Sequence, residues 1–138
     1  MVTSPNYPSQ YPHNLEQTQT IQVEQGLILS LLFTAFNIQS DWGTANCNED
    51  HLTIADGDGT ILMEKSCGST LHGDVDIGGQ SIGSSLPSSI TSRSNSVNLV
   101  FKTDGNDIKY VNSNLTRTGW SVSWSAVTPG FTRQLIRK

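Results

Sequence analysis

Hydrophobic side chains occupy every second position in several short segments of this chain, which is the period of a half-buried β-strand. The strands that this pattern predicts cover residues 20–23, 27–33, 51–55, 60–63, 97–101 and 120–124. In the segment 27–33 both faces carry apolar residues, as expected of a central strand. In the last strand, Trp120, Val122 and Trp124 alternate with serines, so we expect these three side chains to face the core.

Turn-forming residues separate the predicted strands and exclude a helix from the start of the chain. The segment 3–12 contains three prolines, so we expect an extended arm there. Residues 56–59, Asp-Gly-Asp-Gly, predict a hairpin turn. The segment 68–93 is rich in Gly and Ser, and we expect a long loop with one short strand. Short strands without an amphipathic helix indicate an all-β fold, an antiparallel β-sandwich.

The composition supports one globular domain and excludes two classes of partner. A length of 138 residues is close to the commonest domain size. Only 14% of the residues are charged, against about 25% in an average globular protein, and the net charge is -4. Nucleic acids and anionic membranes bind basic patches, whereas this chain carries a net negative charge, so we expect neither as a partner. No stretch approaches the roughly 20 apolar residues of a membrane helix, so we expect no membrane insertion.

Several short motifs follow one another in the order of a CUB domain. They are Ser4-Pro5-Asn6-Tyr7-Pro8, Tyr11-Pro12, Phe33-x-x-Phe36-x-Ile38, Cys47-x-x-Asp50, Asp56-Gly57, Cys67-Gly68, Phe101-Lys102-Thr103-Asp104 and Gly119-Trp120. The chain therefore resembles this family from about Val2 to Val127. The resemblance implies a secreted or extracellular β-sandwich of jelly-roll type over residues 1–128, with residues 129–138 as a tail or linker. In that family the module binds a partner and does not catalyse a reaction.

Three departures from the family pattern point to where this chain differs from its relatives. Most CUB domains carry two disulfides, but Gln17 and Gln19 stand where a Cys and a Trp of the first pair's region often lie. The loops over 39–47 and 67–92 are longer than usual. The chain also begins at the Ser-Pro motif, so we expect the first edge strand of the family fold to be truncated.

The two cysteines predict one bridge between Cys47 and Cys67 and an oxidising compartment. Such a bridge closes a loop of about 20 residues and stabilises the fold by about 3 kcal/mol in the chain-entropy model. The alternative is two buried free thiols in a cytosolic protein. Asn114-Leu115-Thr116 is a glycosylation acceptor sequence, which supports a secreted glycoprotein.

The resemblance also implies a calcium site. In the calcium-binding subset of CUB domains, one Glu and two Asp residues meet at one end of the sandwich, braced by a Tyr of the N-terminal arm. Asp50, Asp104 and Tyr11 match three of these positions, whereas the Glu position is occupied by Gln39. A glutamine can ligate calcium through its carbonyl oxygen but brings no charge. Further candidate ligands are Asp41, Glu49, the carbonyl of Gly105 and the side chain of Asn106.

Calcium would serve binding by drawing loops together and leaving an acidic cluster exposed to a partner protein. By resemblance, Tyr11, Asp50 and Asp104 orient a Lys side chain of that partner. Three alternatives stay open: Asp50 and Asp104 as hydrogen-bonded loop carboxylates without metal, a metal-independent adhesion or glycan-binding module of spermadhesin type, and a structural spacer of a larger secreted protease. The neutral Gln39 favours the second, and the retention of the other three residues favours the calcium site.

Two motifs with a catalytic or metal-binding appearance fail on closer reading. Residues 79–83 fit the Gly-x-Ser-x-Gly pattern around Ser81, but all three histidines precede Ser81, and no helix is expected after it. Residues 56–59 begin like an EF-hand loop, yet the ligand spacing fails after the second Asp. We therefore expect no catalytic site in this chain, although it could be a module of a larger extracellular protease.

Overall fold

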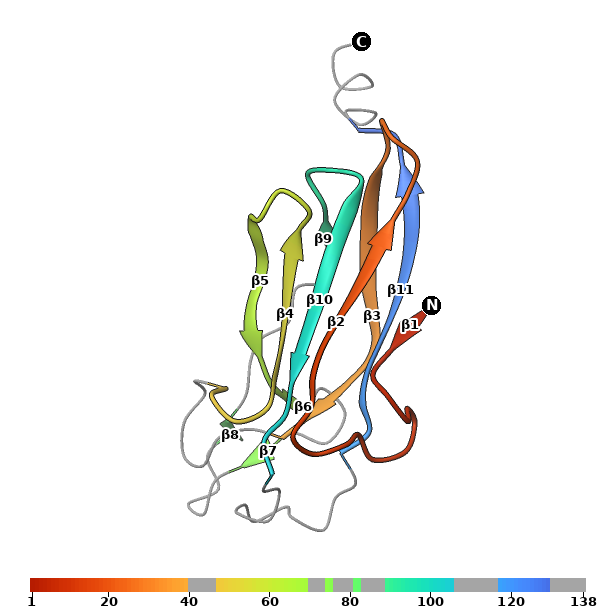
Figure 1. Ribbon diagram of the computed structural model, residues 1–138. Helices are drawn as coiled ribbons and strands as arrows, with labels where there is room; N and C mark the ends of the chain where they lie inside the picture. The colour runs from red at the N-terminus through yellow and green to blue at the C-terminus, as the bar shows by residue number, and fades with distance from the viewer. Residues whose placement is uncertain (40–46, 70–73, 76–80, 83–88, 106–116, 130–138) are drawn as a thin grey trace.

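Two antiparallel sheets face each other across a single core, which confirms the predicted all-β sandwich (Figure 1). A computed structural model describes residues 1–39, 47–69, 74–75, 81–82, 89–105 and 117–129. The strands are β1 Val2–Thr3, β2 Glu16–Gln22, β3 Ile28–Ile38, β4 His51–Asp56, β5 Ile61–Ser66, β6 Gly68–Ser69, β7 Asp74–Val75, β8 Ser81–Ile82, β9 Ile90–Thr91, β10 Ser96–Lys102 and β11 Gly119–Val127. Within these ranges, no helix is long and apolar enough to cross a membrane.

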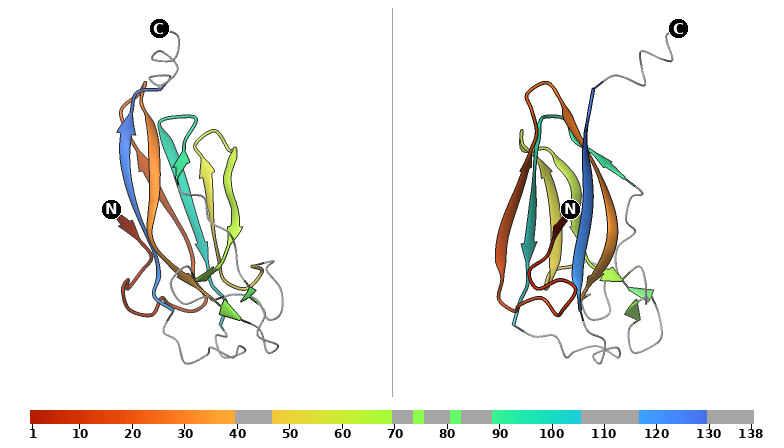
Figure 2. Two further views of the ribbon diagram at one scale, coloured as in Figure 1. Left: turned by 180° about the vertical axis from the view of Figure 1, so that it is seen from behind. Right: turned by 90° about the vertical axis from the view of Figure 1, so that its right-hand side faces the viewer.

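The chain crosses between the sheets several times, as in a jelly roll. One sheet has the order β1-β11-β3-β6, with β9 also paired to β3, and the other has the order β2-β10-β4-β5. The side view shows these two layers face to face, and β7 and β8 pair with each other near one end (Figure 2). Gln19 Nε2 of β2 donates to the Thr3 carbonyl of β1 at 2.9 Å, which links the two sheets.

Alternate residues of the long strands form the core. The fully buried large side chains on strands include Leu29, Leu31, Phe36, Ile38, Leu52, Ile54, Val97, Leu99, Phe101 and Trp120. Phe101 packs edge-on against Tyr11 of the arm at 5.1 Å and against Trp120 at 6.0 Å between ring centroids. These aromatic contacts join β10, β11 and the arm into one packed unit.

A β-bulge in β3 changes which residues face the core. Ser121 lies opposite Ala35 and Val122 opposite Phe33, so Thr34 is an extra residue in β3. An extra residue reverses the inward-facing parity. Leu29 and Leu31 point inward before the bulge, and Phe36 and Ile38 are buried after it, so the alternating pattern breaks near residue 33 although β3 continues to Ile38.

Trp124 lies on the same face of β11 as Trp120 and Val122, opposite the buried Leu31, as expected, but it is not buried with them. Trp120 and Val122 are fully buried, whereas Trp124 is 40% exposed. The reason lies in the edge of the sheet, since β1 pairs with β11 only at Ser121 and Val122. Beyond that point, no strand of the described residues covers the outer edge of β11.

The segment 68–93 contains more strand than expected. Instead of one short strand, the described part of it contributes four strands of two residues each, β6 to β9. Two of them pair with β3, and the other two pair with each other. Such short pairings rely on backbone hydrogen bonds, so they leave no alternating side-chain pattern for a sequence reading to detect.

The turn between β4 and β5 is the predicted hairpin, and a buried carboxylate anchors it. Gly59 N–H donates to the Asp56 carbonyl at 2.9 Å, and Gly59 has a φ of 96°. Asp56 Oδ1 accepts from the amides of Arg93 at 2.5 Å and Ser94 at 3.0 Å, and its Oδ2 accepts from Asp58 N–H at 2.9 Å. Burial alone would raise the pKa of Asp56, but these hydrogen bonds lower it to about 2. The carboxylate therefore joins the β4–β5 turn to the bend before β10.

Candidate functional site

The candidate site lies at the end of the sandwich opposite the β4–β5 hairpin, where the N-terminal arm crosses beneath the sheets (Figure 1). At this end β3 ends, β4 begins, β10 ends and β11 begins. The arm contains the residues 4–15, and none of them is helical, as predicted from the prolines. Four segments that are distant in sequence therefore meet around the arm.

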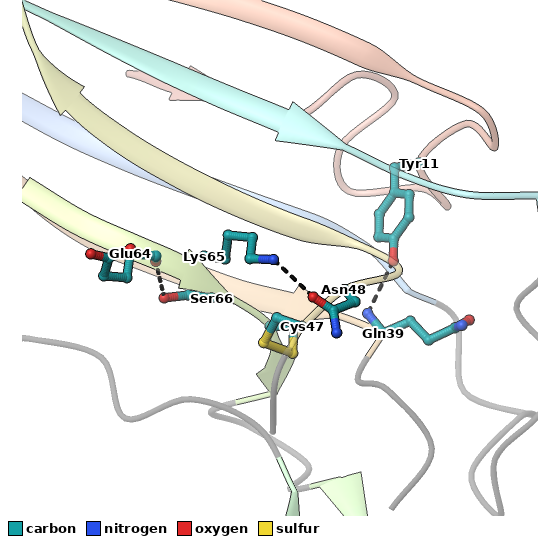
Figure 3. The surroundings of a disulfide bond; sticks show 8 residues. Tyr11, Gln39, Cys47, Asn48, Glu64, Lys65 and Ser66 are labelled. Carbon is teal, nitrogen blue, oxygen red and sulfur yellow. Dashed lines mark hydrogen bonds between the residues drawn. A yellow bond between two sulfur atoms is a disulfide. The ribbon is translucent and has the colours of Figure 1, made fainter. Parts of the chain in front are cut away.

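Tyr11 and Asp50 form the centre of this end. Both are almost fully buried, with 2% and 1% of their surface exposed. The Tyr11 hydroxyl donates to Asp50 Oδ2 at 2.6 Å and accepts from the Gln39 backbone N–H at 3.0 Å. Figure 3 shows the Tyr11 hydroxyl directed at Gln39. Because the amide of Gln39 donates to it, the hydroxyl proton is directed to Asp50.

Asp104 completes the group through its backbone. The Asp104 N–H donates to Asp50 Oδ1 at 2.9 Å, so each oxygen of the Asp50 carboxylate accepts one hydrogen bond. The Asp104 carbonyl accepts from Asn14 N–H at 2.9 Å, which ties the segment after β10 to the arm. The neighbouring Thr103 hydroxyl adds a bond to the Pro12 carbonyl at 2.8 Å. The arm and the end of β10 are thus held together over several residues.

Burial dominates the electrostatics of the centre. Desolvation raises the pKa of Asp50 to about 7, although hydrogen bonds from Tyr11 and the Asp104 amide act in the opposite direction. The Asp104 carboxyl group contributes to this net rise, by repulsion and by a side-chain hydrogen bond with Asp50, so the two carboxyl groups lie close together. Burial, followed by the charge of Asp50, raises the pKa of Tyr11 well above its usual value. Negative charge at this centre is costly without a cation.

The other predicted site residues are distributed around this centre. Gln39 is fully buried at the end of β3, Glu49 is half-buried beside Asp50, and Gly105 is exposed next to Asn14. Asp41, Asn106 and the glycosylation candidate Asn114 lie outside the described residues. Among the residues that are described, no group of three or more His, Cys, Asp or Glu side chains converges as a metal cluster would.

The predicted disulfide is confirmed and lies beside the candidate site. Cys47 and Cys67 are joined with a Cα–Cα distance of 5.5 Å, and both are fully buried. Figure 3 shows the bridge next to the Lys65–Asn48 contact, in which Lys65 Nζ donates to Asn48 Oδ1 at 2.8 Å. The bridge ties Cys47 to Cys67, and it therefore fixes the position of the backbone three residues before Asp50.

Sequence reasoning missed two buried polar residues at this end. Arg117 is only 3% exposed, and its Nη1 donates to Asn37 Oδ1 at 3.2 Å. Its backbone N–H donates to Gln10 Oε1 at 2.8 Å, and its carbonyl accepts from Tyr11 N–H at 3.2 Å. In the sequence, Arg117 stands in a polar segment after a glycosylation acceptor, where an arginine is normally exposed to solvent.

The sequence is similar both to a protein-family model and to individual proteins. Residues 1–81 match the family model described as CUB domain. The chain is 35% identical over 127 residues to human cubilin, which covers 92% of this chain and 3% of cubilin. It is 31% identical over 108 residues to neuropilin-2 of Rattus norvegicus, which covers 75% of this chain and 10% of that protein. The chain therefore spans only a small part of these relatives.

Solved structures show the same architecture. The MASP-1 CUB2 domain bound to Ca2+ is similar with a TM-score of 0.64 and 25% identity, covering 89% of this chain and 88% of that one. The CUB1-EGF-CUB2 domain of human MASP-1/3 is similar with a TM-score of 0.69 and 24% identity, covering 97% of this chain and 43% of that one. The second likeness supports the fold alone.

Proposed function

Because this chain belongs to the CUB family, we propose that it is a non-catalytic extracellular module that binds a partner protein through a calcium-braced acidic cluster. The cluster consists of Tyr11, Asp50 and Asp104. The observation that carries the proposal is the buried Asp50 carboxylate, held between the Tyr11 hydroxyl and the Asp104 amide with a second carboxyl group close by. The domain would extend over residues 1–128, and residues 129–138 would be a tail or linker.

The donor set at this end suits calcium, which prefers six to eight oxygen ligands. The Asp50 carboxylate accepts hydrogen bonds from the Tyr11 hydroxyl and the Asp104 amide, and a carboxylate has about four lone-pair sites, so it can also ligate a cation. Asp50, Asp104 and the side-chain oxygen of Gln39 would hold the ion, with the Gly105 carbonyl beside them. Asp41, Glu49 and Asn106 are the further proposed ligands. Bound calcium would neutralise the repelling carboxylates and draw the loops together. The calcium-bound MASP-1 CUB2 domain supports this choice of ion.

Gln39 sets the expected strength of the site. It is fully buried directly after β3, and its backbone N–H donates to the Tyr11 hydroxyl at 3.0 Å, so it lies next to the cluster. A Glu at this position would add a negative charge, whereas the amide adds only a neutral oxygen. We therefore expect weaker calcium binding than a site with three carboxylates would have, and we expect Gln39→Glu to strengthen it.

The partner contact would follow from the same residues. A lysine ammonium is a compact charge with three donors, and carboxylates bind it through charge-assisted hydrogen bonds. Asp104 is half-buried, so its carboxyl group is the member of the cluster that solvent and a partner can reach. Tyr11 and Asp50, which are more deeply buried, would orient this carboxyl group. A glycan on Asn114 and secretion of the parent protein complete the proposal.

Thermal unfolding with calcium and with chelator tests the metal site. A ligand at 100 times its Kd stabilises the fold by about 2.7 kcal/mol, which raises Tm by about 5–10 °C. Asp104→Asn removes the carboxylate but retains the backbone N–H that holds Asp50, so it should abolish most of the calcium effect. The matched control is Asp58→Asn at the opposite end of the sandwich, which should retain the effect. Coincident curves for the unmodified chain would refute calcium binding.

A second candidate is a metal-independent module that binds a glycan or an adhesion partner. The neutral Gln39 at the Glu position favours it. Glycan-array binding in the presence of chelator, unchanged by Asp104→Asn, would support this candidate over the first. Loss of partner binding on chelation would exclude it.

A further inference from the structure

We propose that Arg117 is a positioning residue for the acidic cluster, because it holds the N-terminal arm against the end of β3 and so directs the Tyr11 hydroxyl at Asp50. This role deepens the proposed function and rests on it for its effect on calcium. The residue itself lies outside the proposed ligand set. Arg117 would contribute by fixing the position of the Tyr11 hydroxyl relative to Asp50.

The backbone of Arg117 holds the arm directly. Its carbonyl accepts from Tyr11 N–H at 3.2 Å, and its N–H donates to Gln10 Oε1 at 2.8 Å. Two successive arm residues are therefore bound to one residue that lies just before β11 begins at Gly119. With the Tyr11 backbone fixed at one end and the ring packed on Phe101, the hydroxyl has little freedom to move.

The side chain of Arg117 binds β3 close to Gln39, whose amide is the second hydrogen-bond partner of the Tyr11 hydroxyl. The guanidinium donates to Asn37 Oδ1 at 3.2 Å, and Asn37 is buried in β3. Only two residues later, the Gln39 N–H donates to the Tyr11 hydroxyl at 3.0 Å. Arg117 thus contacts both the arm that carries Tyr11 and the strand end that carries the Gln39 amide. One residue, through its backbone on one side and its guanidinium on the other, therefore links the arm to the end of β3.

A buried arginine is an unusual way to make these contacts, and its chemistry explains why it suits them. The guanidinium stays charged when it is buried, and its planar set of donors fixes direction as well as distance. Taking such a group out of water is costly unless its donors are used, so a 3% exposed arginine stabilises one arrangement of its neighbours. Outer groups that orient ligands in this way change metal affinity by about 10- to 100-fold when they are removed.

The test replaces the guanidinium with groups of similar length. Arg117→Met removes the charge and the donors, and we expect calcium affinity to fall about tenfold. Arg117→Lys keeps one charged donor able to reach Asn37, and we expect a loss of no more than about threefold. Arg93→Met at the opposite end is the matched control and should leave calcium affinity unchanged. Equal affinity of the Arg117→Met and Arg93→Met proteins would overturn the proposal.

A double-mutant cycle separates positioning from a general loss of structure. If Arg117 acts through Tyr11, Arg117→Met should cost little further calcium affinity in a Tyr11→Phe background. A full tenfold loss in both backgrounds would mean that Arg117 acts independently of the hydroxyl, and the proposal would be wrong. Asn37→Ala, which removes the acceptor from the other side, should reproduce part of the loss.

A readout without calcium keeps this inference distinct from the metal proposal. In chelator, Arg117→Met should speed hydrogen exchange of the Gln39 amide about tenfold more than that of the Leu99 amide, which reports on the core of β10. Uniform acceleration of both amides would show only global destabilisation and would overturn the positioning role. If the unmodified chain shows no calcium effect while the selective change at Gln39 appears, the metal proposal fails and the positioning role stands.

Discussion

Replacing Tyr11 with Phe tests the centre of the candidate site most directly. The substitution removes only the hydroxyl, which donates to Asp50 Oδ2 at 2.6 Å and accepts from Gln39 N–H at 3.0 Å. A buried hydrogen bond to a charged group contributes about 1.5–3 kcal/mol, and a stranded buried amide costs about 1–3 kcal/mol. We therefore expect Tyr11→Phe to lower the free energy of unfolding by about 3 kcal/mol and Tm by about 10 °C.

Urea unfolding at 25 °C in chelator, followed by tryptophan fluorescence, measures this loss. The matched control is Tyr7→Phe in the same arm, because the Tyr7 hydroxyl makes no hydrogen bond to the described residues that could be lost. The control should stay within about 0.5 kcal/mol of the unmodified chain. Equal stability of the two variants would show that the hydroxyl contacts contribute nothing and would refute the role of the Tyr11 hydroxyl in holding Asp50.

The remaining predictions concern the framework around the site. Gly119→Ala should destabilise the fold by more than about 2 kcal/mol in urea, because Gly119 has a φ of 92° and a Cβ would overlap the Ser4 hydroxyl; an unchanged midpoint would contradict this. The lowered pKa of Asp56 predicts stability that is present above about pH 4 and lost as pH falls toward 2, amounting to roughly 2 kcal/mol. Asp56→Asn should remove this acid dependence, and an identical pH profile would exclude it. Replacing Cys47 and Cys67 by Ser should cost about 3 kcal/mol, and a reductant should then have no further effect on Tm.

The sequence predicted the long strands because their side chains alternate, and it failed where backbone geometry decides the outcome. Nothing in the residues around Thr34 announces a bulge, since the extra residue is visible only against the partner strand. The exposure of Trp124 depends on how far β1 extends along β11, and only the tertiary structure shows this. The short strands β6 to β9 were missed for the same reason, because pairing partners rather than side chains define them.

The candidate site was predictable to the extent that short motifs specify it. Tyr11, Asp50 and Asp104 were selected by their place in the family pattern, and the structure brings the hydroxyl, the carboxylate and the amide together. Arg117 could not be found in this way, because a charged residue in a polar segment gives no sign that it is buried. Its contacts with Gln10 and Tyr11 of the arm and with Asn37 of β3 join segments that are distant in sequence, so only the folded chain reveals them.

Within the described part of the chain, the outer edge of β11 beyond Val122 has no strand partner, which has a practical consequence for handling the isolated module. Beyond Val122 the strand carries an exposed Trp124, and the whole of Gly119–Val127 has neither a charged residue nor a proline. Edges of this kind favour pairing between molecules in concentrated solution. A lysine at Ser125, on the exposed part of the strand and far from the acidic end, should improve solubility without altering partner binding.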